Sequence, residues 1–435
     1  MKLNSDSREI AWGLMVSASA KIFAVACSYA LNFALAQMLG SAQLGIFSLA
    51  FTVIVSTTFV ARLGLDYVML RHSALFWTAN KKEILAAWYR KSMHVVAVSS
   101  FLAMLCMVLL ARPLASELFN EQEVFLPIVI MALAIIPQTL LFIQAETLKG
   151  AGFIRASQVL QGDGGGVAVY GAALCLCVPL ACLWGVVGAC LGFMAASWLA
   201  FFLGVRLTPA AFRNKGEEKG PTGLNLVQLG LPLFFASIMS LIVAKASIIM
   251  LGIWETASTV GIFAISYKMA LLGSNIQTAC CTIMGPRIAA IHSSGNSKEL
   301  ARYYRRGTLF SWAISFCVLG LLIAASPLIM ELLGPDFAEG VDILRLLALG
   351  ELIMLFFGPV SIALIVTGHS LQHCKAVIIA AVVVLVAGGV LIPVYGIIGA
   401  VAAAAAGSIS QSFVQALYIK RYLGFFPCIF RFGFL

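Results

Sequence analysis

Three lysines stand inside long apolar stretches of the sequence, where a positive charge is costly. Lys21 lies in the first stretch, Lys245 in the run SLIVAKASIIMLG, and Lys268 in the stretch that follows. At 1.5 Å per helical residue, Lys245 lies about 13 Å from Trp254, and Lys268 lies about 15 Å from Ser258. Because these two stretches run antiparallel, both lysines are expected at nearly the same depth.

The chemistry open to these lysines is the binding of an anion. A charge inside a membrane costs about 2.5–3.5 kcal/mol on insertion scales and normally faces a bundle interior or a watery cavity. The alternative is that the long side chain reaches the interface with water. For Lys21 both interpretations stay open. For Lys245 and Lys268 the depth favours the positively charged wall of a cavity.

Acidic residues at comparable depth are fewer. Glu351 lies near the middle of its apolar stretch, where it could pair with a lysine or bind a proton or a cation. Asp163 lies in QGDGGGV, which lacks the spacing of a phosphate-binding loop and fits close helix packing or local unwinding. If transport is coupled to H+ or Na+, Glu351 and Asp163 are the candidates. Arg62 and Asp66, four residues apart, are interpreted as an interfacial helix pair.

Two prolines are candidate hinges. Pro232 in LGLPLFF and Pro359 in FFGPV each remove a backbone hydrogen bond, which marks either a hinge or an irregularity of packing. The eleven cysteines show no zinc-binding pattern. No Walker motif, nucleophile elbow or carboxylate pair placed for acid–base chemistry is present. The sequence therefore predicts a protein that is not an enzyme and needs no metal or cofactor.

The composition identifies the solvent in which these residues act. The chain has 435 residues, of which 61% are hydrophobic and 11% charged, and its mean hydropathy is +1.01. Soluble proteins carry about 25% charged residues, and about 20 apolar residues cross a bilayer. We therefore expect an all-α polytopic membrane protein. Its twelve expected spans are residues 11–38, 43–63, 92–114, 124–146, 156–180, 184–206, 224–252, 258–285, 307–333, 340–367, 375–395 and 397–419.

The loops between these spans carry a strong charge asymmetry. Lysine and arginine gather in one set of loops and glutamate in the other, and the net charge is +10. Because basic loops stay in the cytoplasm, both termini are expected there. The basic residues lie beside spans and lack interleaved aromatic residues. They are expected to contact anionic membrane lipids, at about 1 kcal/mol each, and not nucleic acid.

Three motifs occur twice in the same order. They are LWGVVGA and VYGIIGA (183–189 and 394–400), LGIFSLA and VGIFAIS (44–50 and 260–266), and LKGAG and VTGHS (148–152 and 366–370). Each half then holds six spans, and an even number gives both halves the same orientation, as in parallel-repeat transporters. The expected parts are a six-helix bundle, a cytoplasmic linker, a second six-helix bundle and a cytoplasmic tail, at residues 1–206, 207–223, 224–423 and 424–435.

Several glycine-rich stretches carry a resemblance to a known family. They are LGSAQLGIFSLA, ARLGLD, LKGAGFIRA, LGLPLFF, IMLGIWETASTVGIFAISYKMA and LLGPDFAEGVDILRLLAL. Through them nearly the whole chain resembles the polysaccharide (O-antigen/exopolysaccharide) flippases of the multidrug/oligosaccharidyl-lipid/polysaccharide (MOP) exporter superfamily. Ser247 is a departure, because relatives often have an acidic residue there.

The resemblance implies a MATE-like fold and a carrier in the bacterial inner membrane. It would move an undecaprenyl-pyrophosphate-linked oligosaccharide by alternating access, through a cationic central cavity to which Lys245, Lys268 and Lys21 would contribute. A polysaccharide polymerase and a chain-length regulator are the implied protein partners. The alternative function is a small-molecule cation antiporter of the same superfamily. A membrane polymerase would need long external loops, and all of the external loops here are short.

Overall fold

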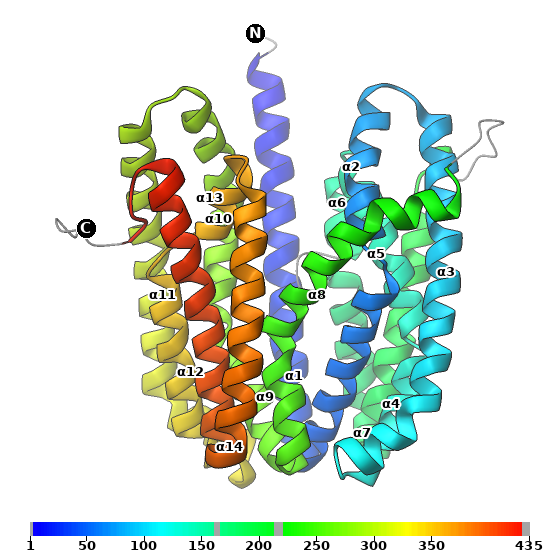
Figure 1. The fold of residues 1–435 in the computed structure, drawn as a ribbon. Helices are drawn as coiled ribbons and strands as arrows, with labels where there is room; N and C mark the ends of the chain where they lie inside the picture. The colour runs from blue at the N-terminus through cyan, green and yellow to red at the C-terminus, as the bar shows by residue number, and fades with distance from the viewer. Residues whose placement is uncertain (1–2, 161–165, 213–220, 429–435) are drawn as a thin grey trace. The chain divides into compact units, whose positions relative to one another are not determined.

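The computed structural model describes residues 3–160, 166–212 and 221–428, and every regular element among them is a helix (Figure 1). The chain divides into two compact units, residues 1–238 and 239–435. The first unit holds α1 Leu3–Ala61, α2 Leu65–Thr78, α3 Lys82–Pro113, α4 Phe125–Ala132, α5 Ile135–Gly150, α6 Ile154–Leu160 and α7 Val167–Leu207. It also holds the short turns of helix Leu114–Leu118, Gln122–Val124 and Ala210–Phe212.

The boundary between the units falls inside α8, Gly223–Trp254. The second unit continues with α9 Ala257–Ala270, α10 Leu272–Ser293, α11 Ser297–Leu333, the short turn Pro335–Phe337, α12 Gly340–Leu355, α13 Val360–Val366 and α14 Ser370–Leu423. The predicted bounds of the bundles and of the linker stay predictions.

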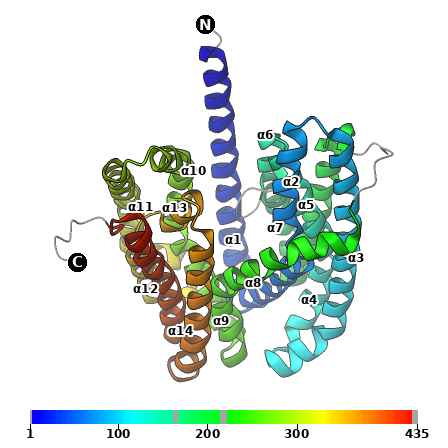
Figure 2. The same cartoon turned by 45° about the horizontal axis from the view of Figure 1, so that its top comes forward.

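Three of the long helices are helical hairpins. The backbone leaves helical geometry at Gly40 in α1, Gly185 in α7 and Gly396 in α14, with φ of 70°, 57° and 55°. These angles are accessible to glycine and costly for other residues. Figure 1 and Figure 2 show the two halves of α14, orange and red, side by side. The α7 and α14 hairpins are tight, since a side chain at Gly188 would collide with the Leu180 carbonyl, and one at Gly399 with that of Leu391.

These hairpins account for the twelve expected spans. In the described residues eight helices are long and apolar enough to cross a membrane, and the bent pair α4 and α5 makes a ninth. Three of the nine contain a glycine hairpin and therefore cross twice. The predicted fold class, an all-α membrane protein of about twelve spans, is confirmed.

The backbone repeats between the units. Left-handed residues follow the helices at matching points, at Asn80 and Gly295, Asn120 and Gly334, Gly152 and Gly368, and Gly185 and Gly396. The third pair corrects the sequence alignment. Gly152 N–H donates to the Lys149 carbonyl as Gly368 N–H does to that of Ile365. Aligning LKGAG with VTGHS pairs Gly150 with Gly368, and this alignment is therefore wrong by two residues. A short sequence motif defines the register of a repeat less firmly than a hydrogen-bond pattern does.

Candidate functional site: charged residues in the two units

Lys245 on α8 and Lys268 in the last turn of α9 come together within the second unit. Their ammonium groups lie close enough for the two charges to repel one another. Both side chains are half-buried. Within the described part of the chain, no carboxylate forms an ion pair with Lys245. The structure thus brings two positively charged side chains together at this point of the second unit.

Local packing sets the position of each lysine. The side chain of Thr256 accepts a hydrogen bond from the Thr259 N–H at 3.4 Å and caps the start of α9, which fixes the helix that carries Lys268. The half of α8 that carries Lys245 packs on α14, where any side chain at Gly388 would meet the sulfur of Met250. Small residues of this kind let membrane helices approach closely.

Glu351 lies in the same unit and is 8% exposed. Its Oε2 accepts a hydrogen bond from Ser274 Oγ of α10 at 2.7 Å, and Tyr267 of α9 is an electrostatic neighbour. Among the described residues Glu351 forms no salt bridge, so the lysine pairing that the sequence left open is not made. A buried carboxyl group held by one hydroxyl can accept a proton or a small cation.

The two candidate hinge prolines lie in different surroundings. Pro359 is the N-cap residue directly before α13 and follows Gly358, whose φ is 71°, in the break after the end of α12. Two carbonyls freed by this break are satisfied by α11, since Trp312 Nε1 donates to Leu352 at 3.3 Å and Tyr304 donates to Phe357 at 2.9 Å. Pro232 lies inside α8, which continues through it. Both hinge roles stay predictions.

Two further candidate residues lie elsewhere. Lys21 is half-buried on α1 and belongs to the first unit, so its participation in one site with Lys245 and Lys268 stays a prediction. Asp163 lies outside the described residues.

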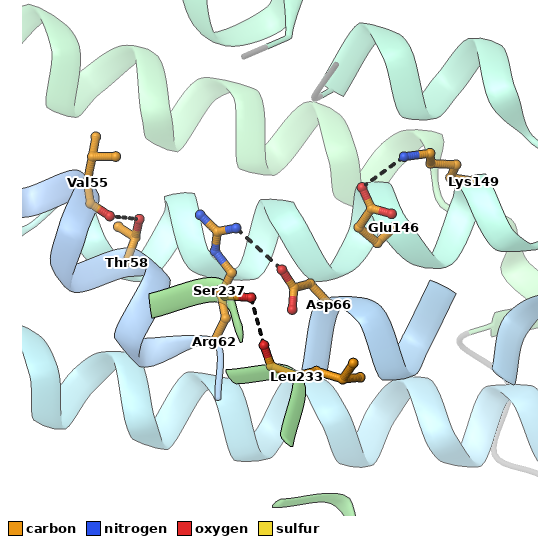
Figure 3. Close-up of polar contacts among 8 residues, drawn as sticks. All are labelled: Val55, Thr58, Arg62, Asp66, Glu146, Lys149, Leu233 and Ser237. Carbon is orange, nitrogen blue, oxygen red and sulfur yellow. Dashed lines mark hydrogen bonds and ion pairs between the residues drawn. The ribbon is translucent and has the colours of Figure 1, made fainter. Parts of the chain in front are cut away.

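The first unit contains a buried ion pair that the sequence placed wrongly. Arg62 and Asp66 are only 2% and 8% exposed, whereas the spacing suggested an interfacial helix pair. They do not share a helix, because α1 ends before Arg62 and α2 begins after Gly64. Arg62 Nη1 lies 3.5 Å from Asp66 Oδ2 (Figure 3). The guanidinium carbon lies 3.1 Å from the ring centre of Phe142 and 4.0 Å from that of Phe59.

A second carboxylate lies near this pair. Glu146 on α5 interacts electrostatically with Arg62 and forms an ion pair with Lys149 at 3.4 Å (Figure 3). The apolar context of Arg62, at the end of FTVIVSTTFVAR, is the one sequence signal of its burial. Arg62 and Glu146 thus each have an oppositely charged partner within the first unit.

Comparison with known proteins shows where the chain belongs. A family model described as polysaccharide biosynthesis protein matches residues 34–342, more than two thirds of the chain. The chain is a member of this family. The resemblance to the polysaccharide flippases is thereby confirmed. No curated protein matches the sequence of this family member.

Solved structures show the same fold at low sequence identity. The lipid II flippase MurJ in an inward closed conformation has a TM-score of 0.75 and 13% identity over 93% of this chain and 87% of MurJ. An inward-facing multidrug resistance MATE transporter of the MOP superfamily has a TM-score of 0.73 and 14% identity over 94% of this chain and 98% of its own.

A MOP transporter from Pyrococcus furiosus, described as having a binding pocket of reverse polarity, has a TM-score of 0.67 and 14% identity over 95% of both chains. At this level of identity, the likeness to these proteins shows that this family member has the MOP transporter fold.

Proposed function

We propose that the protein is a flippase that moves a lipid-linked oligosaccharide across the bacterial inner membrane. The repeat unit would be linked to undecaprenyl pyrophosphate and used to build O-antigen, capsule or exopolysaccharide. The observation that carries this proposal is the pair Lys245 and Lys268, two mutually repelling charges on transmembrane helices. An anionic pyrophosphate bound beside them would offset their repulsion, and the lipid tail would stay in the bilayer.

The family and the fold support the proposal from separate directions. The matched family is one of polysaccharide biosynthesis. MurJ, which has the same fold, is described as a lipid II flippase. The rival function, a small-molecule cation antiporter, is supported by the likeness to MATE transporters. A cationic drug would be repelled by Lys245 and Lys268, which favours the flippase.

The remaining assignments complete the proposal. Lys21 of the first bundle would add a third positive charge to the central cavity. Glu351, with Asp163 as the second candidate, would couple export to a gradient of H+ or Na+. The two bundles, residues 1–206 and 224–423, would alternate in access, with both termini in the cytoplasm. The protein would bind the lipid-linked glycan and membrane lipids and would work beside a polymerase and a chain-length regulator.

Glycan export in cells tests this function. In a strain that lacks the gene, the wild-type chain should restore surface glycan, while Lys245→Ala and Lys268→Ala should leave the lipid-linked oligosaccharide on the cytoplasmic leaflet. Lys298→Ala removes an exposed lysine at the start of α11 and is the matched control. Wild-type export by the double variant, at equal amounts of protein in the membrane, would reject the cationic site.

A further inference from the structure

Residues 424–428, directly after α14, pack on the second unit. Gly424 terminates α14 with a φ of 79°, in the left-handed conformation in which helices commonly end at a glycine. Phe425 and Cys428 are only 9% and 1% exposed. The ring centre of Phe425 lies 5.5 Å from that of Tyr304 on α11, and Tyr304 is fully buried. This short segment is therefore part of the packed second unit.

The first unit contains the same contact between a phenylalanine and a tyrosine. Phe212, which follows α7, is fully buried, and its ring centre lies 6.1 Å from that of Tyr89 on α3. Tyr89 and Tyr304 occupy matching places, each nine residues after a left-handed residue, Asn80 in the first unit and Gly295 in the second. They belong to the similar stretches LAAWYRK and LARYYRR (85–91 and 300–306). The contact is therefore a repeated feature of the fold.

In the second unit this tyrosine also contacts a broken helix. The hydroxyl of Tyr304 donates a hydrogen bond at 2.9 Å to the carbonyl of Phe357, which lies in the break between α12 and α13. The ring centre of Phe426 lies 6.5 Å from that of Phe357. Residues 424–428 thus reach the break directly as well as through Tyr304. The matching residue of the first unit, Leu141, lies inside the unbroken helix α5, so the contact with a break is particular to the second unit.

The broken helix carries Glu351, the candidate for ion coupling. Glu351 lies on α12 six residues before Phe357, which is about 9 Å along a helix. Its carboxylate accepts the hydrogen bond of Ser274 on α10 at 2.7 Å. Trp312 follows Tyr304 by two turns on the same face of α11 and donates at 3.3 Å to the carbonyl of the residue after Glu351. Side chains of α11 thus support α12 both at the break and beside Glu351, and a change at the break would move the carboxylate relative to Ser274.

We propose that residues 424–428 are a positioning element for ion coupling: Phe425 holds Tyr304, and Tyr304 holds the broken helix that carries Glu351. Phe425 and Tyr304 are positioning residues, because they act on Glu351 through the backbone of α12. Such support matters because a functional side chain must be held within about 0.5 Å of its productive geometry. The effect on coupling rests on the proposed function, in which Glu351 binds the coupling ion, whereas the effect on the break does not.

Hydrogen exchange tests the support of the break without any substrate. In lipid nanodiscs, Tyr304→Phe and Phe425→Ala should each raise the exchange rate of the amides of residues 352–360 about tenfold or more, because the Phe357 carbonyl loses its partner or the support of that partner. Tyr303→Phe removes a hydroxyl one residue away on the same helix and should leave the rate unchanged. No change in Tyr304→Phe, or an equal rise in Tyr303→Phe, would overturn the proposal. An equal rise in α5 of the first unit would also overturn it, since the whole fold would then be loosened.

Export in vesicles tests the effect on coupling. A chain that ends after Gly424 lacks Phe425, and an imposed pH or sodium gradient should stimulate its export about threefold less or weaker still, because the hydrogen bond at Glu351 is disturbed. A chain that ends after Cys428 keeps the segment, and Phe425→Tyr keeps the ring, so both should show the stimulation of the wild type. Lower export with unchanged stimulation in the shorter chain would overturn the positioning role. Absence of export by the wild type would reject the proposed function instead, and the exchange experiment would still decide whether the segment supports the break.

Discussion

The two units treat buried charge in opposite ways. In the first, Arg62 lies against Asp66 and between two phenylalanine rings, and Glu146 is nearby with its own partner Lys149. In the second, Lys245 and Lys268 repel one another, and the buried acid Glu351 accepts a hydrogen bond from a serine hydroxyl and forms no ion pair among the described residues. Charges that are balanced within a unit hold its structure together. Charges left in repulsion cost stability and are retained where a ligand uses them.

The largest effect should come from breaking the balanced pair. Asp66→Ala would leave the Arg62 guanidinium buried without its carboxylate, and breaking such a pair costs about 3–5 kcal/mol. Thermal unfolding in detergent and the amount of protein in the membrane measure this loss. Asp342→Ala is the matched control, because Asp342 and Arg345 form an exposed pair at 3.2 Å whose removal should cost less than about 1 kcal/mol. Equal losses in the two variants would show that Arg62 and Asp66 are not a structural pair.

Removing the charge of Lys245 should raise the stability of the protein, whereas Asp66→Ala should lower it. Lys245→Met removes the repulsion with Lys268 and should stabilise the protein by roughly 0.5–2 kcal/mol, the usual range where a site is strained for function. The same change should lower export at least tenfold, because losing a buried charged contact costs about 2 kcal/mol or more.

Lys245→Arg keeps the charge and should retain more export than Lys245→Met. Thermal unfolding and surface glycan, measured on the same preparations, check both effects. If Lys245→Met is less stable than the wild type, the proposed difference between the charges of the two units is wrong.

Glu351, the buried acid of the second unit, should matter more for coupling than for folding. Glu351→Gln keeps an oxygen that can accept the Ser274 hydrogen bond, so unfolding should change by no more than about 1 kcal/mol. Export in vesicles should become independent of an imposed pH or sodium gradient, since the amide cannot bind a proton or ionise. A variant whose export still follows both gradients would exclude Glu351 as the coupling site.

Part of this arrangement could be predicted and part could not. The proximity of Lys245 and Lys268 could be expected, because helical rise places both at similar distances from the turn between α8 and α9. The turns at Gly185 and Gly396 are visible as a repeated motif. The burial of Arg62 depends on Phe142, which lies on another helix 80 residues later in the chain. The four-residue spacing of Arg62 and Asp66 does not distinguish a pair on the surface from a pair in the core. Contacts between distant helices, such as Ser274 with Glu351, leave no local pattern.

The last contrast between the units concerns a glutamine that lies on different helices in the two repeats. Gly204 and Gln415 occupy matching places, each the nineteenth residue after its hairpin glycine. In the first unit a side chain at Gly204 would collide with Gln144 of α5, which is fully buried. Within the described chain, neither amide atom of Gln144 has a hydrogen-bond partner. In the second unit Gln415 itself accepts from Ser361 Oγ and contacts His373 Nδ1, both at 2.9 Å.

Methionine substitutions of Gln144 and Gln415 therefore compare an amide without hydrogen-bond partners with one that has them. Gln415→Met would leave Ser361 and His373 without their partner and should cost about 1–3 kcal/mol, the cost of stranding buried polar groups. Gln144→Met removes an amide with nothing to lose and should leave thermal unfolding unchanged or raise its midpoint. Equal destabilisation by both changes would mean that Gln144 is satisfied by bound water, so that the two units share this polar contact after all.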